Sequence, residues 1–150
     1  MPKISLSDFA DVLIKERALG NYFVSGLIIR KDDNVQTIKE TSSQLPENII
    51  VEISEKSDDS EIISGFKSAF ENKKWILVSL KDGHLSPLWR EQLTRLRDSN
   101  SIFIQGETAE TTFYAEQPEE TRIAVVVDEK NIKDINYSEF LNLFRPITEI

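Results

Sequence analysis

The sequence predicts a single α/β domain over residues 1–150, with a mostly parallel five-stranded sheet, helices on both faces and a β-hairpin near residues 102–114. From Tyr22 onward, short apolar segments alternate with helical patterns, which is typical of βαβ units. The segment Trp75–Leu80 is apolar except for Ser79, as expected for a strand buried on both faces of a parallel sheet. A length of 150 residues fits one three-layer domain.

Strands are expected where apolar runs stand between turn residues: Tyr22–Ile29, Ile49–Ile53, Trp75–Leu80, Ile102–Gln105, Thr111–Tyr114 and Arg122–Val127. We interpret Ile102–Gln105 and Thr111–Tyr114 as a hairpin around Gly106–Glu110. Helices are expected to begin at Ser5, Val35, Ser57, Pro87 and Asn136, where capping residues, turn residues or a first-turn proline precede apolar spacing.

Four of these helices carry an apolar stripe, all but the one that begins at Val35. The first is expected to bury Phe9, Val12, Leu13 and Ile14. The last has apolar residues at i, i+3, i+4 and i+7, and we expect Pro146 to end it after Phe144.

Composition excludes several classes of function. The net charge of −8 repels phosphate backbones, so we expect no nucleic-acid binding. Apolar runs of roughly five residues are too short to cross a bilayer, so we expect no membrane association. The start of the chain lacks a signal-peptide pattern and the chain has no cysteine, which fits a cytoplasmic protein.

The end of the first strand lacks a phosphate-binding loop. Such a loop needs glycines, a lysine for the outer phosphates and a hydroxyl for magnesium. When the motif is aligned so that its first glycine is Gly26, Lys31 falls at the position of the second glycine. Asp32 then falls at the position of the motif lysine, and Asp33 at that of the hydroxyl residue. Two carboxylates would repel a triphosphate, so no nucleotide cofactor is predicted.

Asp32 and Asp33 could instead hold a divalent cation together with Asp82, which follows the central strand. Receiver domains use such an acidic pair, but Ser79 stands where their phosphate-accepting aspartate belongs. Lys130, just past the last predicted strand, loosely matches the receiver lysine. The alternative is that the paired aspartates are ordinary helix-start charges.

We predict no catalytic residue and therefore no enzyme. His84 is the single histidine, and the sequence assigns it no serine or acid partner for a triad. One histidine without cysteine does not favour a transition-metal site. An enzyme with His84 as general base is the remaining alternative. Trp75 and Trp89 lie on apolar stripes and are interpreted as core residues.

An acidic cluster surrounds the predicted hairpin. It is either a solvated loop or a docking surface for a protein partner with a basic surface, and self-association is left open. Its members are Glu107, Glu110, Glu116, Glu119 and Glu120.

From Trp75 to about Asn131 the order of features follows a known pattern. An apolar strand begins with Trp75-Ile76-Leu77-Val78, a loop leads to Trp89, and the next helix closes at Arg97-Asp98-Ser99-Asn100. A hairpin carrying Gly106-Glu107 and the strand Ile123–Val127 follow. This segment resembles the second half of an AAA+ module of the dynein and midasin type, in which Asn131 loosely matches the sensor asparagine.

The resemblance departs at the positions that carry chemistry. The acidic pair of the magnesium-binding strand would fall at Ser79-Leu80, the phosphate loop is absent, and no arginine finger is identifiable. The resemblance therefore implies an inactive relative, which acts as a non-catalytic protein-interaction or assembly module on a degenerate nucleotide-binding fold.

A weaker likeness points to another class. Phe66–Leu93 is similar to Toll/interleukin-receptor-type domains, although Glu91 follows Trp89 by two residues where that family has four. The alternative function is thus a receiver-like or Toll-type signalling domain that responds to a cation or phosphate through Asp32, Asp33 and Asp82. A sheet order of 5-1-4-3-2 would favour the P-loop-like interpretation, and 2-1-3-4-5 the alternative.

Overall fold

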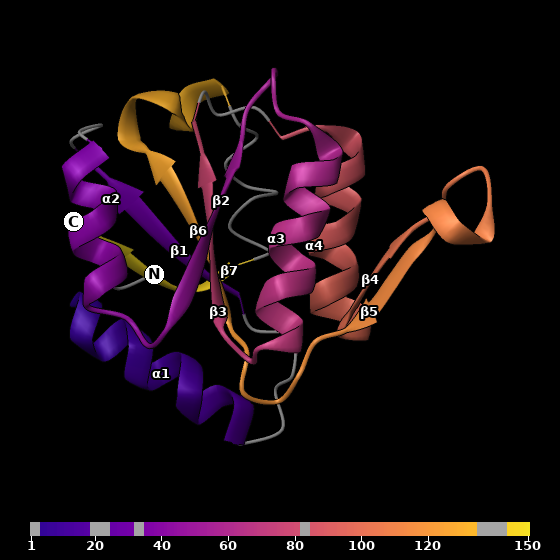
Figure 1. The fold of residues 1–150 in the computed structure, drawn as a ribbon. Helices are drawn as coiled ribbons and strands as arrows, with labels where there is room; N and C mark the ends of the chain where they lie inside the picture. Colours follow the sequence, from indigo (N-terminus) through magenta and orange to yellow (C-terminus); the bar gives the residue numbers. More distant parts are fainter. Residues whose placement is uncertain (1–3, 19–24, 32–34, 82–84, 135–143) are drawn as a thin grey trace.

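The computed structural model describes residues 4–18, 25–31, 35–81, 85–134 and 144–150. Its centre is a sheet of five strands that pair only in parallel (Figure 1). The strands are β1 (Ser25–Arg30), β2 (Asn48–Ile53), β3 (Trp75–Leu80), β6 (Ile123–Asp128) and β7 (Phe144–Glu149). They lie in the order β7-β1-β6-β3-β2, which is 5-1-4-3-2 when the strands of this sheet alone are numbered.

Helices cover both faces of the sheet, which confirms the predicted three-layer α/β fold (Figure 1). The helices α1 (Leu6–Ala18) and α2 (Val35–Ser43) pack on one face, and α3 (Asp59–Glu71) and α4 (Pro87–Ser99) pack on the other. Successive side chains of β3 point to opposite faces of the sheet and so enter two different cores. Trp75 and Leu77 belong to the core under α1 and α2, whereas Ile76 and Val78 belong to the core under α3 and α4.

The ends of α3 and α4 are set by local sequence. Asp58 caps α3 by accepting a hydrogen bond from the Ser60 N–H. Ser86 accepts one from the Trp89 N–H, and Pro87 occupies the first turn of α4. Asn100 ends α4 in the left-handed conformation, with φ 55°. The Trp89 ring then stacks on Phe66 of α3 at a centroid distance of 5.6 Å.

Gly26 explains how α1 reaches the sheet. A side chain at this position of β1 would collide with the ring of Phe9, which is fully buried. Glycine therefore permits the close approach of helix and strand. The predicted stripe of α1 is wrong at Ile14, which is 47% exposed because it lies on the far side of the helix from Phe9 and Leu13.

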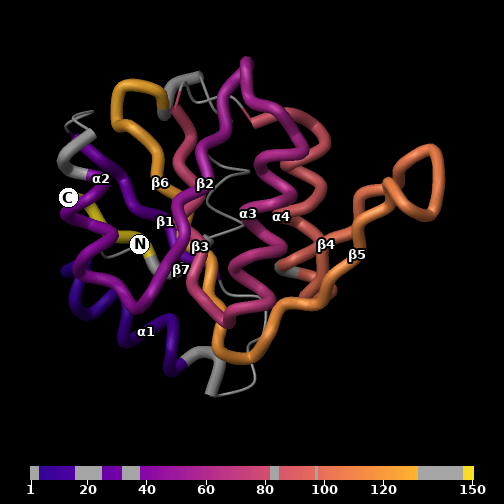
Figure 2. Tube along the Cα trace, viewed as in Figure 1, coloured from indigo at the N-terminus to yellow at the C-terminus, as the bar shows by residue number. Residues whose placement is uncertain are grey.

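A separate two-stranded antiparallel sheet, β4 (Ser101–Ile104) and β5 (Phe113–Glu116), forms the hairpin. Figures 1 and 2 show it projecting from the body beside α4. The second strand begins two residues later than predicted. The hydroxyls of Thr111 and Thr112 accept hydrogen bonds from the N–H groups of Thr108 and Gly106, so both threonines belong to the tip.

The prediction of a helix through Phe144 is wrong at its end, because Phe144 begins the strand β7. Residues 135–143, which carry the rest of that predicted helix, lie outside the described residues. Pro146 does not stop a helix but lies in β7 at a break in register, where three steps along β7 match two steps along β1. An edge strand with a bulge tolerates proline, since no ladder hydrogen bond is required there.

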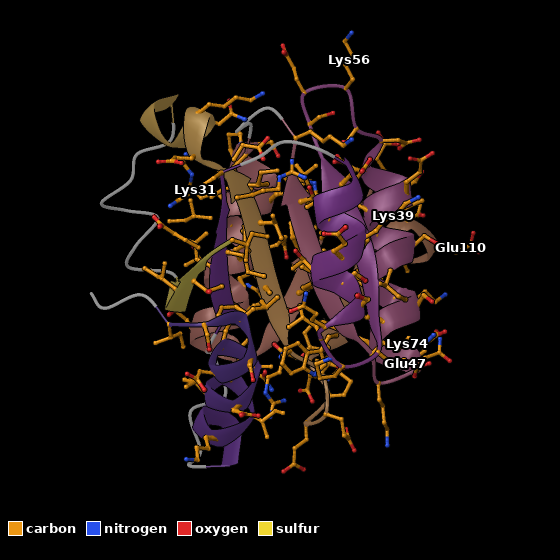
Figure 3. The ribbon with its side chains drawn as sticks, turned by 90° about the vertical axis from the view of Figure 1, so that its left-hand side faces the viewer. Lys31, Lys39, Glu47, Lys56, Lys74 and Glu110 are labelled. Atoms are coloured by element: carbon orange, nitrogen blue, oxygen red, sulfur yellow. The ribbon has the colours of Figure 1, made fainter. Side chains whose placement is uncertain are left out.

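All five strands point the same way, so their carboxyl ends meet at one edge of the sheet. Figure 3 shows Lys31 and Lys56, which follow β1 and β2, toward that end, and Glu47 and Lys74, which precede β2 and β3, at the other. In the described part of the chain, no helix is long and apolar enough to cross a bilayer.

Candidate functional site

The carboxyl edge of the sheet contains a pocket of about 300 Å³. In open parallel α/β sheets this edge is where ligands bind. Side chains from four strand ends and from α2 line it: Arg30, Ile38, Lys39, Ile50, Glu52, Ser79, Lys81, Asp128 and Lys130.

A buried ion pair joins the ends of β1 and β6 in this pocket. The Arg30 Nε donates to Asp128 Oδ1 at 2.6 Å, and the two side chains are 6% and 5% exposed. The two residues are direct partners in the parallel register of the strands. An arginine and a carboxylate that have both left water hold each other strongly in place, because either one alone would be a buried uncompensated charge.

The other acidic side chain of the pocket is also engaged. Glu52 lies 3.2 Å from the Lys81 Nζ, and both side chains are about half exposed. Ser79, the polar residue of β3, is buried and lines the same pocket. Four of the lining side chains are basic and two are acidic, and the pairs Arg30–Asp128 and Lys81–Glu52 engage both acidic ones.

The predicted metal ligands Asp32, Asp33 and Asp82 lie outside the described residues, as does His84. The described part of the chain contains no group of three potential acidic or histidine metal ligands. The metal site therefore stays a prediction. Both tryptophans are core residues: Trp75 and Trp89 are 4% and 2% exposed, and the Trp89 indole donates to Asp59.

The five glutamates of the predicted acidic cluster are all exposed, but they do not form one patch. Glu107 and Glu110 lie at the hairpin tip, and Glu116 ends β5 at its base. Glu119 and Glu120 belong to the connection to β6, where Glu120 lies 3.4 Å from the Lys73 Nζ. That lysine contributes, after the local backbone hydrogen bond, to holding the pKa of Glu120 below its ordinary value.

The hairpin also presents an aromatic pair that sequence patterning did not identify. Phe103 and Tyr114 are cross-strand partners, with exposures of 37% and 56% and ring centroids 6.4 Å apart. Tyr114 donates its hydroxyl to Glu116, and this bond is the main cause that raises the pKa of the phenol. The alternation Ile102, Phe103, Ile104 could have indicated that Phe103 points away from the core. Its exposure, however, depends on the hairpin projecting from the rest of the domain, which the sequence does not show.

Gln92 fixes the hairpin to α4. Its side chain donates to the Phe103 carbonyl and accepts from the Phe103 N–H, both at 2.8 Å, and the residue is 1% exposed. A glutamine amide thus takes the place of a neighbouring strand along β4. The sequence pattern does not single out Gln92, because the contact depends on how α4 and β4 pack.

Asn131, which loosely matches the sensor asparagine, lies just beyond β6 in a 3₁₀ helix over Glu129–Asp134. Its amide Nδ2 is buried and finds no hydrogen-bond partner among the described residues.

No protein-family model and no curated protein matches this sequence. Two features of the chain itself therefore bear on its function: the carboxyl edge of the sheet with its buried ion pair, and the projecting hairpin.

Proposed function

We propose that this chain is a non-catalytic protein-interaction or assembly module built on a degenerate nucleotide-binding-like fold. The strand order β7-β1-β6-β3-β2 is the observation that carries the proposal. It is the 5-1-4-3-2 order expected for a P-loop-like core, and the resemblance of residues 75–131 to AAA+ modules points the same way.

The residues at the carboxyl edge support the non-catalytic part. In P-loop NTPases, phosphoryl transfer uses a phosphate loop after the first strand and a strand-end carboxylate that helps to hold magnesium. Here the first strand ends in Arg30, which is paired with Asp128, and the third carries Ser79. Since Asp128 neutralises Arg30, the pair is poorly suited to hold either magnesium or a phosphate.

The hairpin supports the interaction part. It combines exposed aromatic rings with acidic side chains on an element that projects from the body (Figure 2). Aromatic residues are enriched in protein interfaces, and acidic residues around them select a basic partner and speed its association. A receiver-like or Toll-type signalling domain is less well supported, since its expected order is 2-1-3-4-5.

The proposal is tested by quantitative affinity purification with the wild-type chain and two charge-reversal variants. The first variant changes the three hairpin acids, Glu107→Lys, Glu110→Lys and Glu116→Lys. The control changes three exposed glutamates elsewhere, Glu40→Lys, Glu47→Lys and Glu71→Lys, and has the same net charge.

We expect a partner that wild type and control recover equally and that the hairpin variant recovers at least about tenfold less, equivalent to 1.4 kcal/mol of binding. Equal recovery by both variants, or no enriched partner at all, would count against the proposal. The signalling alternative instead predicts that millimolar magnesium raises the melting temperature and that Asp32→Asn removes the effect.

A further inference from the structure

The two long edges of the hairpin differ: the β4 edge is closed by Gln92, whereas the β5 edge is open. From this we infer that β5 accepts an extended, basic segment of a protein partner as a third strand. The inference rests on the proposed interaction function and specifies its geometry. Strand addition of this kind draws affinity from main-chain hydrogen bonds and specificity from alternate side chains.

The direction of the backbone groups follows from the Gln92 contacts. Because Gln92 takes both the N–H and the C=O of Phe103, these groups point away from β5. In an antiparallel ladder the residue opposite a non-hydrogen-bonded position also points its groups outward. Tyr114 is that residue, so its N–H and C=O face away from β4.

A backbone hydrogen bond at the base of the hairpin agrees with this alternation of hydrogen-bonded and non-hydrogen-bonded pairs. Gln117 donates its backbone N–H to the Asn100 carbonyl at 2.8 Å, so residues 100 and 117 lie at a hydrogen-bonded position, although the Asn100 N–H itself donates to Leu96 of α4. Ser101 and Glu116 are then a non-hydrogen-bonded pair like Phe103 and Tyr114. The β5 edge therefore presents the N–H and C=O groups of Tyr114 and Glu116.

No described residue satisfies these four backbone groups. The backbone hydrogen bonds of the loops and the side-chain bonds to the backbone leave both residues out. Exposed edges of this kind are templates for another strand, and natural proteins usually shield them. On β4 the shield is a buried glutamine. β5 contacts α3, but no described side chain bonds its outward backbone groups as Gln92 does on β4.

The exposed face of the hairpin supplies side-chain contacts for such a strand. Phe103 is held between the Tyr114 ring and the Arg95 guanidinium, which lies 5.5 Å from the Phe103 ring centroid. The opposite face carries Ile104 and Phe113, which pack against the core. On the exposed face, a strand added beside β5 thus meets the Tyr114 ring, which Phe103 already supports from β4, at little cost in side-chain ordering.

Charge selects the occupant. The hairpin, residues 101–116, contains three glutamates and no basic residue, and Arg95 is the cation beside Phe103. A basic segment gains from this arrangement, whereas a second copy of the chain would bring glutamates against glutamates across a new β5–β5 pair. We therefore assign the edge to a basic partner strand and not to self-pairing.

The test titrates isotope-labelled protein with an octapeptide of alternating lysine and valine, followed by two-dimensional NMR of the amides. Two control peptides are the glutamate–valine counterpart and the lysine–valine peptide with every amide N-methylated. We expect saturable shifts and slowed hydrogen exchange at Tyr114 and Glu116, and at least about tenfold weaker binding of both controls.

A pair of variants tests the edge from the protein side. Tyr114→Pro removes an outward N–H without removing a β4–β5 hydrogen bond, and Tyr114→Val loses the ring but keeps the N–H. Tyr114→Pro should bind the peptide at least about tenfold more weakly than Tyr114→Val. The peptide controls decide the question if Tyr114→Pro does not fold.

Equal binding of the N-methylated peptide, no saturable binding, or shifts centred on the β2 edge would overturn the inference. Concentration-dependent shifts of the β5 amides without peptide would identify a second copy as the occupant and also overturn it. Suppose that the variant with Glu107→Lys, Glu110→Lys and Glu116→Lys loses its partner in the affinity experiment, but the peptide does not bind β5. The proposed function then stands, and the inference of strand addition is wrong. If the peptide binds β5 but no partner is recovered, the proposed function fails by itself.

Discussion

At the scale of single residues, the buried Arg30–Asp128 pair is the main polar contact at the carboxyl edge of the sheet. The two side chains are 98 positions apart in the sequence and meet because β1 and β6 are neighbours in register. Each is the last residue of a buried strand and lies one residue beyond the end predicted from the sequence, Ile29 for β1 and Val127 for β6. That they face each other follows from the sheet order, which the sequence could not supply.

Replacing one member of this pair should destabilise the fold strongly. Arg30→Met and Asp128→Leu are each expected to cost about 3–5 kcal/mol, because each leaves a buried charge without its partner. The double variant should lose much less than the sum of the two. Urea denaturation of the four proteins measures this coupling, and additive losses would contradict the assignment of a buried pair.

The Tyr114 phenol gives a pH-dependent readout of the hairpin. Its pKa is raised from 10.0, first by the hydrogen bond to Glu116 and then by desolvation and by the negative charge of Glu116. Because the folded-state pKa is the higher one, this stabilisation is complete below the unfolded pKa and is lost as the pH rises through the folded value.

Glu116→Gln should therefore lower the Tyr114 pKa. The measurement is the difference in phenolate absorbance between proteins with Tyr114 and with Tyr114→Phe, titrated in both backgrounds. An unchanged midpoint in Glu116→Gln would show that Glu116 does not hold the hydroxyl.

At the scale of elements, the side chain of Gln92 links the hairpin to α4. Gln92 fixes β4 along α4 through the backbone of Phe103. Because this glutamine is buried, its two hydrogen bonds are protected from competition with water.

Gln92→Met keeps the volume and removes both bonds, so we expect a loss of about 1–3 kcal/mol in unfolding free energy and faster amide exchange at Phe103. Gln44→Met, at an exposed glutamine, is the matched control and should leave both unchanged. Exchange at Phe103 that is as slow in Gln92→Met as in wild type would mean that other packing holds the hairpin.

The predicted and observed boundaries of the helices and strands agree in some elements and differ in others. Strands β2 and β3 and helices α3 and α4 were predicted closely, because caps such as Asp58 and Ser86 and the apolar periodicity agree there. The strand β7 was missed because Pro146 suggests a helix end, and only its edge position with a bulge makes proline acceptable. The start of β5 was misplaced because threonine favours strands, whereas Thr111 and Thr112 fold into the tip.

At the scale of the whole molecule, the alternation of elements sufficed to predict a three-layer α/β domain, since parallel strands require crossovers that cover both faces. The order of the strands is a different kind of information, because it depends on which apolar strands become neighbours. The predicted acidic cluster separated in the same way: its glutamates are close in sequence, but the hairpin carries Glu107 and Glu110 away from Glu119 and Glu120.

The central claim is that a nucleotide-binding-like fold has lost its nucleotide chemistry, and titration calorimetry with ATP in the presence of magnesium tests it most directly. The chain lacks a phosphate loop, and the Arg30–Asp128 pair occupies the edge where one would lie. We predict no saturable heat of binding up to millimolar ATP, with or without magnesium. Magnesium-dependent binding of ATP at micromolar concentration would contradict the account.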